Sequence, residues 1–160
     1  MLLLFMVEGD RYGMDVMDVV EVIPFIPLKR LPHTPNYVAG VFNYRGQAVP
    51  VIDVSMLISG KSAQSYFSTR IVIVNYPLPN GHRYLLGLIT EHATETIKAS
   101  KSDFISSGLR AKGNEYLGQL LMDEKGMVQC IEMNRLLPSE LITSLYERQA
   151  GPSAEIEVSR

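Results

Sequence analysis

Residues 35–53, which read PNYVAGVFNYRGQAVPVID, decide the fold class of this 160-residue chain. Residues 41–44 and 47–52 are short runs of apolar, β-branched and aromatic side chains. Arg45-Gly46 between them is typical of a turn, because glycine adopts positive φ without a Cβ penalty. The stretch therefore predicts a β-hairpin with Arg45 at its tip. Pro50 has no N–H to donate and is expected at a sheet edge or a bulge.

Two short helices are predicted beside the hairpin. Thr34-Pro35 fits the cap and first position of one helix, and Gly40 fits its end. Asp53 or Ser55 is expected to cap the other, which ends at Gly60.

The composition is that of an ordinary globular domain, with 46% hydrophobic residues, 20% charged residues and a net charge of −2. No basic block indicates a nucleic-acid surface, and a single cysteine, Cys130, excludes an internal disulfide framework. Residues 2–7 lack the basic flank of a signal peptide, and no apolar run reaches the roughly 18 residues of a membrane span. We therefore expect a cytoplasmic protein with no nucleic-acid partner and no direct membrane insertion.

The rest of the chain reads as short strands in two similar halves. Arg11-Tyr12 and Arg83-Tyr84 each open a second strand, and residues 20–23 resemble residues 94–97, which indicates a diverged duplication. Prolines make residues 24–34 a stiff loop. Strands are expected at 2–7, 12–16, 19–23, 71–74, 84–89, 94–97, 117–122 and 127–133, with a polar loop at 98–115.

Five short strands per half cannot bury both faces of an open sheet, so each half is expected to close into a small barrel, with a core between the two. The predicted single domain spans residues 1–148. Its first barrel covers about 13–65 and its second about 66–137. Strand 2–7 can be shared by the two barrels. Ser139 is expected to cap a terminal helix at 139–148, followed by a flexible tail at 149–160.

The hairpin motif also carries a family resemblance. Residues 38–46, VAGVFNYRG, and 49–53, VPVID, resemble the signature of CheW-type chemotaxis adaptor domains. Further similarity at Tyr12-Gly13-Met14, at residues 86–91 and at Tyr116-Leu117-Gly118 extends the resemblance over about residues 2–146. It implies a mainly β fold of two five-stranded SH3-like barrels, with no catalytic activity and no cofactor.

The resemblance also implies partners: the regulatory domain of a CheA-type histidine kinase, and the cytoplasmic tip of a methyl-accepting chemoreceptor. One barrel would pair with the kinase domain, and the groove between barrels would receive the receptor's helical hairpin, recruiting the chain to membrane-bound receptor clusters. Within the family the chain is most similar to adaptors of Wsp-type surface-sensing pathways, which control cyclic-di-GMP and biofilm formation. The chain departs from the family pattern at two places. Phe42 and Tyr44 replace aliphatic residues, and Ile131-Glu132-Met133 stands where the family more often has Leu-Asp-Leu.

The candidate partner-binding residues lie on the hairpin and on one preceding strand. Arg45 has two readings, an exposed recognition residue or a brace that bonds loop carbonyls. Phe42 and Tyr44 share one strand face and are expected in the core. The full candidate set is Glu21, Val38, Val41, Asn43, Arg45, Gly46, Val49 and Pro50.

Other chemistry-bearing residues favour structural roles. His33, His82 and His92 lack metal-ligand spacing, and Cys130 is expected to be a buried small hydrophobe. Strand methionines, including Met122 and Met127, are interpreted as core filler. Two rival hypotheses remain: a free-standing ligand-binding or enzymatic β-barrel with a pocket at loop 98–115, and a detached regulatory module of a kinase.

Overall fold

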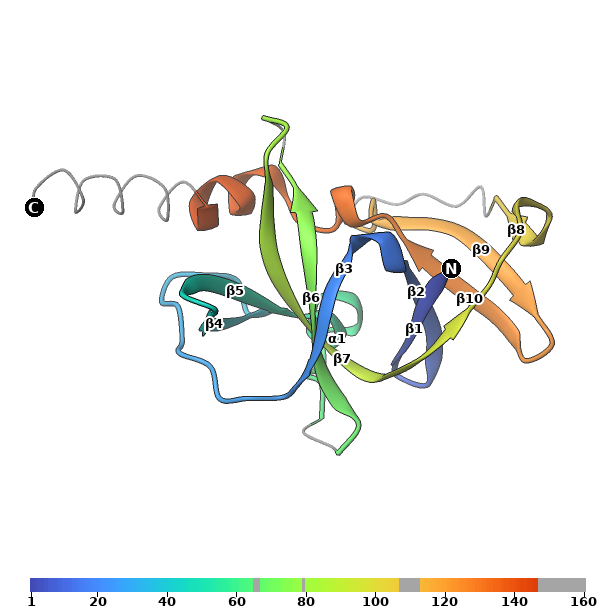
Figure 1. Ribbon diagram of the computed structural model, residues 1–160, viewed down its shortest axis with the longest axis horizontal. Coiled ribbons are helices and arrows are strands. Elements are labelled where there is room, and N and C mark those ends of the chain that lie inside the picture. The colour runs from blue at the N-terminus through green and yellow to red at the C-terminus, as the bar shows by residue number, and fades with distance from the viewer. Residues whose placement is uncertain (65–66, 79, 107–112, 147–160) are drawn as a thin grey trace, which may run out of the picture.

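The computed structural model describes residues 1–64, 67–78, 80–93 and 95–106 in full, and 113–146, with the backbone alone at position 94. Its architecture is mainly β, as the sequence predicts, and Figure 1 shows that a continuous sheet curls into two barrels side by side. The elements are β1 (Leu2–Val7), β2 (Asp10–Asp15), η1 (Val16–Asp18), β3 (Val19–Pro24), β4 (Val38–Tyr44), β5 (Gln47–Asp53), α1 (Val54–Ser59), β6 (Thr69–Pro77), β7 (Arg83–Ile97), η2 (Lys101–Asp103), β8 (Phe104–Ile105), β9 (Leu117–Asp123), β10 (Gly126–Ile131) and η3 (Met133–Arg135).

The first barrel is formed by β4, β5, the first part of β7, β6 and β3, in that order. β6 pairs antiparallel with β7 from Thr69 to Pro77, while β5 joins β7 in parallel through Val51 to Asp53. Strand β4 pairs with β5 and not with β3. The segment that connects β3 to β4 meets β4 at an isolated bridge, in which Lys29 and Val41 exchange two hydrogen bonds of 2.9 and 2.7 Å. The seam of the first barrel therefore lies between β3 and β4.

The second barrel is formed by the last part of β7, then β1, β2, β10, β9 and the two-residue strand β8. β1 pairs antiparallel with both β2 and β7, and β10 joins β2 in parallel at Gln129 and Cys130. The barrel is closed by this parallel contact between strands more than 100 residues apart in the sequence.

Strand β7 belongs to both barrels. Residues 83–91 pair with β6, and residues 91–97 pair with β1, so one strand replaces the two predicted at 84–89 and 94–97. His92, with φ of 57°, lies where the strand passes from one barrel to the other. The pairing therefore does not follow the division near residue 65 that the duplication predicts, because β6 and part of β7 complete the first barrel.

Buried side chains form three clusters that match this architecture. One fills the first barrel around Phe42, Val49 and Ile73, and a smaller one fills the second around Leu121 and Val128. The largest lies between the barrels, as predicted, and takes side chains from β1, β4, β5, β6, β7 and the terminal helix. Burial of this apolar surface holds the two barrels together.

The terminal helix is anchored on this shared core. Helical residues run from 139 to the end of the described segment at 146, and the Tyr146 hydroxyl donates to the Leu85 carbonyl at 3.2 Å. Ser139 is the first helical residue and not the cap, because the Pro138 carbonyl already accepts from Ile142 N. The predicted end at 148 and the tail at 149–160 lie outside the described residues.

The predicted hairpin is present as β4 and β5, with Arg45 and Gly46 at φ of 51° and 84° in its turn. Both positive values suit a two-residue hairpin turn. Pro50 lies directly before the stretch of β5 that pairs with β7, so no ladder needs its missing N–H.

One of the two predicted helices is absent. Residues 34–37 form no helix, and Gly40 lies inside β4. This position requires glycine, because a Cβ there would stand 2.4 Å from the Lys29 carbonyl oxygen. Gly40 allows the proline-rich segment to approach β4 and is not a helix end. The other helix, α1, is as predicted: Asp53 accepts from Met56 N at 3.1 Å, and Gly60 ends the helix at φ 76°.

Candidate partner interface

Three side chains meet across the seam of the first barrel. The Tyr44 hydroxyl donates to Glu21 Oε1, and Arg45 NH2 donates to the same oxygen at 3.1 Å. The Arg45 guanidinium also lies 5.0 Å from the centre of the Tyr44 ring, within the range of a cation–π contact. We call this group the Glu21–Tyr44–Arg45 cluster. It links β3 to β4 where backbone pairing is nearly absent.

The cluster is held in place and yet remains accessible. Arg45 is 75% exposed and Glu21 39% exposed, so both can still meet a partner. The hydrogen bond to Glu21 raises the pKa of the Tyr44 phenol, which therefore stays a neutral donor. Arg45 braces the hairpin as one reading expects, except that it bonds a carboxylate and not loop carbonyls. Its recognition role stays a prediction.

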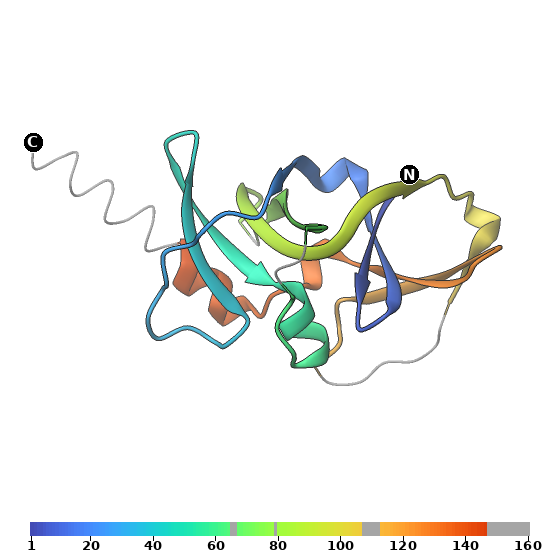
Figure 2. The same ribbon diagram turned by 90° about the horizontal axis from the view of Figure 1, so that it is seen from below.

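Asn43 fixes the turn that presents the cluster. Its side-chain oxygen accepts from Gly46 N at 2.8 Å, and the side chain is exposed. Figure 2 shows this turn, in teal, projecting beyond the rest of the first barrel. Asn43 and Gly46 therefore shape the tip and leave the guanidinium exposed there.

The remaining candidate residues lie deeper. Val38 is 8% exposed, Val49 is fully buried and Pro50 is buried, so the side chains of these three cannot form a partner surface in this conformation. β5 is buried on both faces from Val49 onward, and Val38 packs in the core between the barrels. Val41 is half-buried, beside the Lys29 bridge. Phe42 lies in the core as predicted, whereas Tyr44 is only partly buried.

Apolar residues beside Glu21 extend the accessible surface. Val20 and Val22 on β3 are 42% and 39% exposed, and Met17 in the preceding η1 is 83% exposed. Sequence reasoning missed them, although their positions either side of Glu21 in an alternating strand are a signal. Because side chains alternate along a strand, Val20 and Val22 lie on the face of β3 opposite to Glu21. The exposed apolar strip and the charged tip therefore lie on different faces of this strand.

The described residues offer little for other chemistry. They hold no group of three or more His, Cys, Asp or Glu side chains placed to bind a metal. Burial raises the pKa of the Cys130 thiol to about 11, which leaves it protonated and a poor nucleophile. Across the same residues, no helix is long and apolar enough to cross a membrane. Met122 and Met127 are 45% and 60% exposed, so the prediction that they fill the core is wrong.

Known proteins place this geometry in a family. The CheW-like domain family matches residues 1–141. The chain is 26% identical over 151 residues to the chemotaxis protein CheW of Bacillus subtilis, covering 93% of this chain and 94% of the relative. It is 24% identical over 140 residues to the chemotaxis protein CheW of Klebsiella aerogenes, covering 86% and 81%. The crystal structure of the scaffolding protein TtCheW from Thermoanaerobacter tengcongensis has the same fold, with a TM-score of 0.73, 23% identity and 86% of each chain covered.

Fold and family together define a non-enzymatic scaffold protein. The chain belongs to the CheW-like domain family and is a scaffold or adaptor of chemotaxis-type signalling.

Proposed function

We propose that this chain couples a methyl-accepting chemoreceptor to the regulatory domain of a CheA-type histidine kinase in the cytoplasm, where receptor clusters recruit it. The observation that supports the proposal is the Glu21–Tyr44–Arg45 cluster. It is an exposed guanidinium, already oriented by a carboxylate and an aromatic ring.

This arrangement suits reversible assembly. Arginine is enriched among residues that dominate binding energy, and a side chain ordered before binding loses less conformational entropy when the complex forms. In such a complex, Arg45 would supply orientation. We assign Glu21, Val41, Asn43, Arg45 and Gly46 to the interface directly or through the turn. Val38, Val49 and Pro50 support the hairpin from inside.

We further propose that the pathway is of the Wsp-type surface-sensing kind that controls cyclic-di-GMP. Support comes from Tyr44, which stands where the family pattern usually has an aliphatic residue. Its hydroxyl bonds Glu21, which an aliphatic side chain cannot do, so the cluster has an added component that suits partners private to one pathway. Deleting the gene should lower cyclic-di-GMP in surface-grown cells and leave swimming chemotaxis intact; the opposite pattern would assign the chain to a flagellar pathway.

The experiment on the interface is substitution of Arg45 by alanine. Loss of an interface arginine costs about 2 kcal/mol of binding free energy, or roughly thirtyfold in affinity. Affinities for the kinase regulatory domain and for the receptor tip are measured by calorimetry, with the thermal midpoint checked in parallel.

Arg135→Ala is the matched control, because Arg135 also forms an exposed ion pair, at 3.2 Å to Glu132, away from the seam. Its affinities should stay within about twofold of the wild type. Unchanged affinity of Arg45→Ala for both partners would remove the hairpin tip from the interface.

A further inference from the structure

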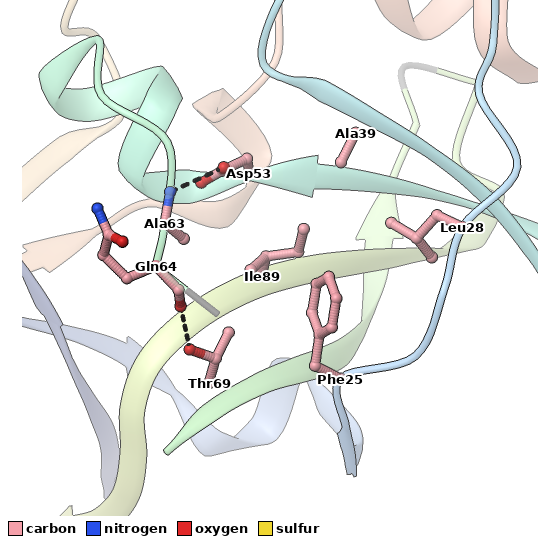
Figure 3. A pocket seen from close by; sticks show the side chains of 8 residues that line it. All are labelled: Phe25, Leu28, Ala39, Asp53, Ala63, Gln64, Thr69 and Ile89. Carbon is pink, nitrogen blue, oxygen red and sulfur yellow. Dashed lines mark hydrogen bonds between the residues drawn. The ribbon is translucent and has the colours of Figure 1, made fainter. Parts of the chain in front are cut away.

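The pocket of the first barrel in Figure 3 has its carboxylate and its hydroxyl already bonded within the chain. Asp53 accepts from Met56 N at 3.1 Å and from Ala63 N at 3.0 Å, and the Thr69 hydroxyl donates to the Gln64 carbonyl. These bonds cap α1 and order the segment that follows it, so the polar groups of this pocket have structural roles. A side chain with unused reactivity lies elsewhere, in the turn between β6 and β7.

The turn between β6 and β7 is short and is closed by backbone hydrogen bonds. Leu78 N donates to the His82 carbonyl at 2.8 Å, and Gly81 N donates to the Leu78 carbonyl at 3.0 Å. Gly81 has φ of 86°, in the region that glycine enters without a Cβ penalty. Figure 1 shows the turn at the top of the view, where the two strands project beyond the terminal helix. The turn therefore stands in solvent, with Gly81 and His82 exposed.

Asparagine and glycine are neighbours in this turn. Of the six asparagines in the chain, Asn80 is the one that glycine follows, and the other five precede tyrosine, glutamate or arginine. Asn80 and Gly81 are both exposed, and a Cβ on Gly81 would meet nothing within 4 Å. Within the described part of the chain, no side chain therefore crowds the space around Gly81.

The turn also orients the Asn80 amide. Its Oδ1 accepts from His82 N at 2.9 Å, which forms an Asx turn. A donor aimed at this oxygen stabilises the negative charge that develops there when a nucleophile adds to Cγ. The Gly81 nitrogen is such a nucleophile, and its attack is intramolecular, so it needs no encounter in solution.

We propose that Asn80 is a site of spontaneous covalent modification, at which the asparagine converts to aspartate and isoaspartate. The Gly81 nitrogen bonds to Asn80 Cγ and gives up its proton, while the bond from Cγ to the side-chain nitrogen breaks and ammonia leaves. Water then opens the resulting cyclic imide. Opening at Cγ gives aspartate, and opening at the backbone carbonyl carbon gives isoaspartate, in which the chain runs through Cγ. In sum, one water is consumed and one ammonia is released.

The closed turn slows this reaction without preventing it. Gly81 N is bonded to the Leu78 carbonyl, so it has to leave that oxygen before it can attack. Exposed turns open locally at a small free-energy cost, while the strands beside them stay paired. We therefore expect Asn80 to react more slowly in the folded chain than in urea, and faster than the other asparagines in both states.

Both products alter the turn. A carboxylate replaces the neutral amide, and isoaspartate adds a backbone carbon between Leu78 and His82, the pair that closes the turn. Leu78 packs against the core between the barrels. The modification therefore starts at an exposed tip, and isoaspartate is expected to loosen the edge of the shared core.

The first test incubates the full chain in warm, mildly alkaline buffer and maps its peptides by mass spectrometry over time. Asn80 should deamidate roughly tenfold faster than Asn36, Asn43 or Asn134, because each of these precedes a bulky side chain. Isoaspartate should appear beside aspartate, since direct hydrolysis of the amide gives aspartate alone. Even deamidation across the asparagines, or aspartate without isoaspartate, would overturn the proposal.

The second test separates the chemistry of the Asn-Gly pair from backbone strain in a turn. Gly81→Ala adds a methyl group beside the attacking nitrogen and should slow the reaction at Asn80 roughly tenfold. Gly126→Ala is the matched control, because Gly126 also has a positive φ, 118°, and room for a Cβ, in the turn between β9 and β10. It should leave the rate at Asn80 unchanged. Equal rates in the two variants would overturn the attack by Gly81, and equal rates in buffer and in urea would overturn protection by the bond to Leu78.

Discussion

Each barrel carries an arginine–carboxylate pair, and the two pairs differ in construction. In the second barrel, Arg11 donates two bonds of 2.7 Å to Asp123, and the side chains are only 17% and 29% exposed. In the first barrel, Arg45 gives Glu21 one bond of 3.1 Å and is 75% exposed. A bidentate, half-sheltered pair links strand β2 to the β9–β10 turn, whereas the exposed pair leaves most donors of its guanidinium unused. An arginine–carboxylate pair is thus sheltered and bidentate in one barrel and exposed in the other, which suits our proposal that Arg45 contacts a partner.

The largest expected effect is the loss of folding when the chain is divided between its two halves. Because β6 and β7 complete the first barrel and β1 and β2 complete the second, residues 1–65 and 66–160 each lack essential strands of both. Neither fragment should show a cooperative thermal transition by circular dichroism, and mixing them should restore one. A two-state melt of either fragment alone would contradict the shared strands and the shared core.

A large effect is also expected at the seam of the first barrel. Gly40→Ala places a Cβ 2.4 Å from the Lys29 carbonyl oxygen, and should lower the free energy of unfolding by about 2 kcal/mol or more. Gly46→Ala is the comparison, because it meets nothing within 4 Å and carries only the strain of φ 84°, about 1 kcal/mol. Urea unfolding measures both. Equal losses would mean that the proline-rich segment moves aside at little cost.

Arg11 and Arg45 are expected to differ, by a smaller amount, in how much each side chain stabilises the fold. Arg11→Ala leaves a half-sheltered carboxylate without its bidentate partner, and should lower the thermal midpoint by several degrees. Arg45→Ala removes an exposed ion pair and should change stability by about 0.5 kcal/mol or less. Calorimetric melts of both variants test this order. If Arg45→Ala proved the more destabilising, the cluster at the seam would be primarily structural.

The smallest expected effect is a change in acid sensitivity. Arg11 holds the pKa of Asp123 at about 2, below its ordinary 3.8. Between these values the unfolded chain binds a proton that the folded chain does not, so stability is full above about pH 4 and is lost as pH falls toward 2. Asp123→Asn should remove that part of the slope in urea midpoints between pH 2 and 6. Parallel profiles for variant and wild type would show that the pair does not link folding to protons.

What the sequence could predict is mostly local. The hairpin turn at Arg45-Gly46 and the helix from Asp53 to Gly60 depend on backbone preferences of neighbouring residues, and the structure confirms both. The motif VAGVFNYRG identified the family, and with it the mainly β fold.

What the sequence could not predict depends on distant partners. Gly40 reads as a helix end in isolation, and only the approach of Lys29 shows why it is glycine. The parallel contacts of β5 with β7 and of β2 with β10 have no local signal, so the strands could not be assigned to barrels. Likewise Val49 and Pro50 match the family motif as well as Arg45 does. Only the structure shows that they are buried and therefore cannot contact a partner directly.

The shared strand has a consequence for synthesis on the ribosome. β1, the most apolar strand of the chain, is made first, and its partner in β7 follows some ninety residues later. At typical elongation rates that delay is on the order of 10 s, during which the outer edge of β1 has no partner. An unpaired apolar edge is a site for aggregation or for chaperone binding. The nascent chain therefore exposes this edge of β1 until β7 has been translated.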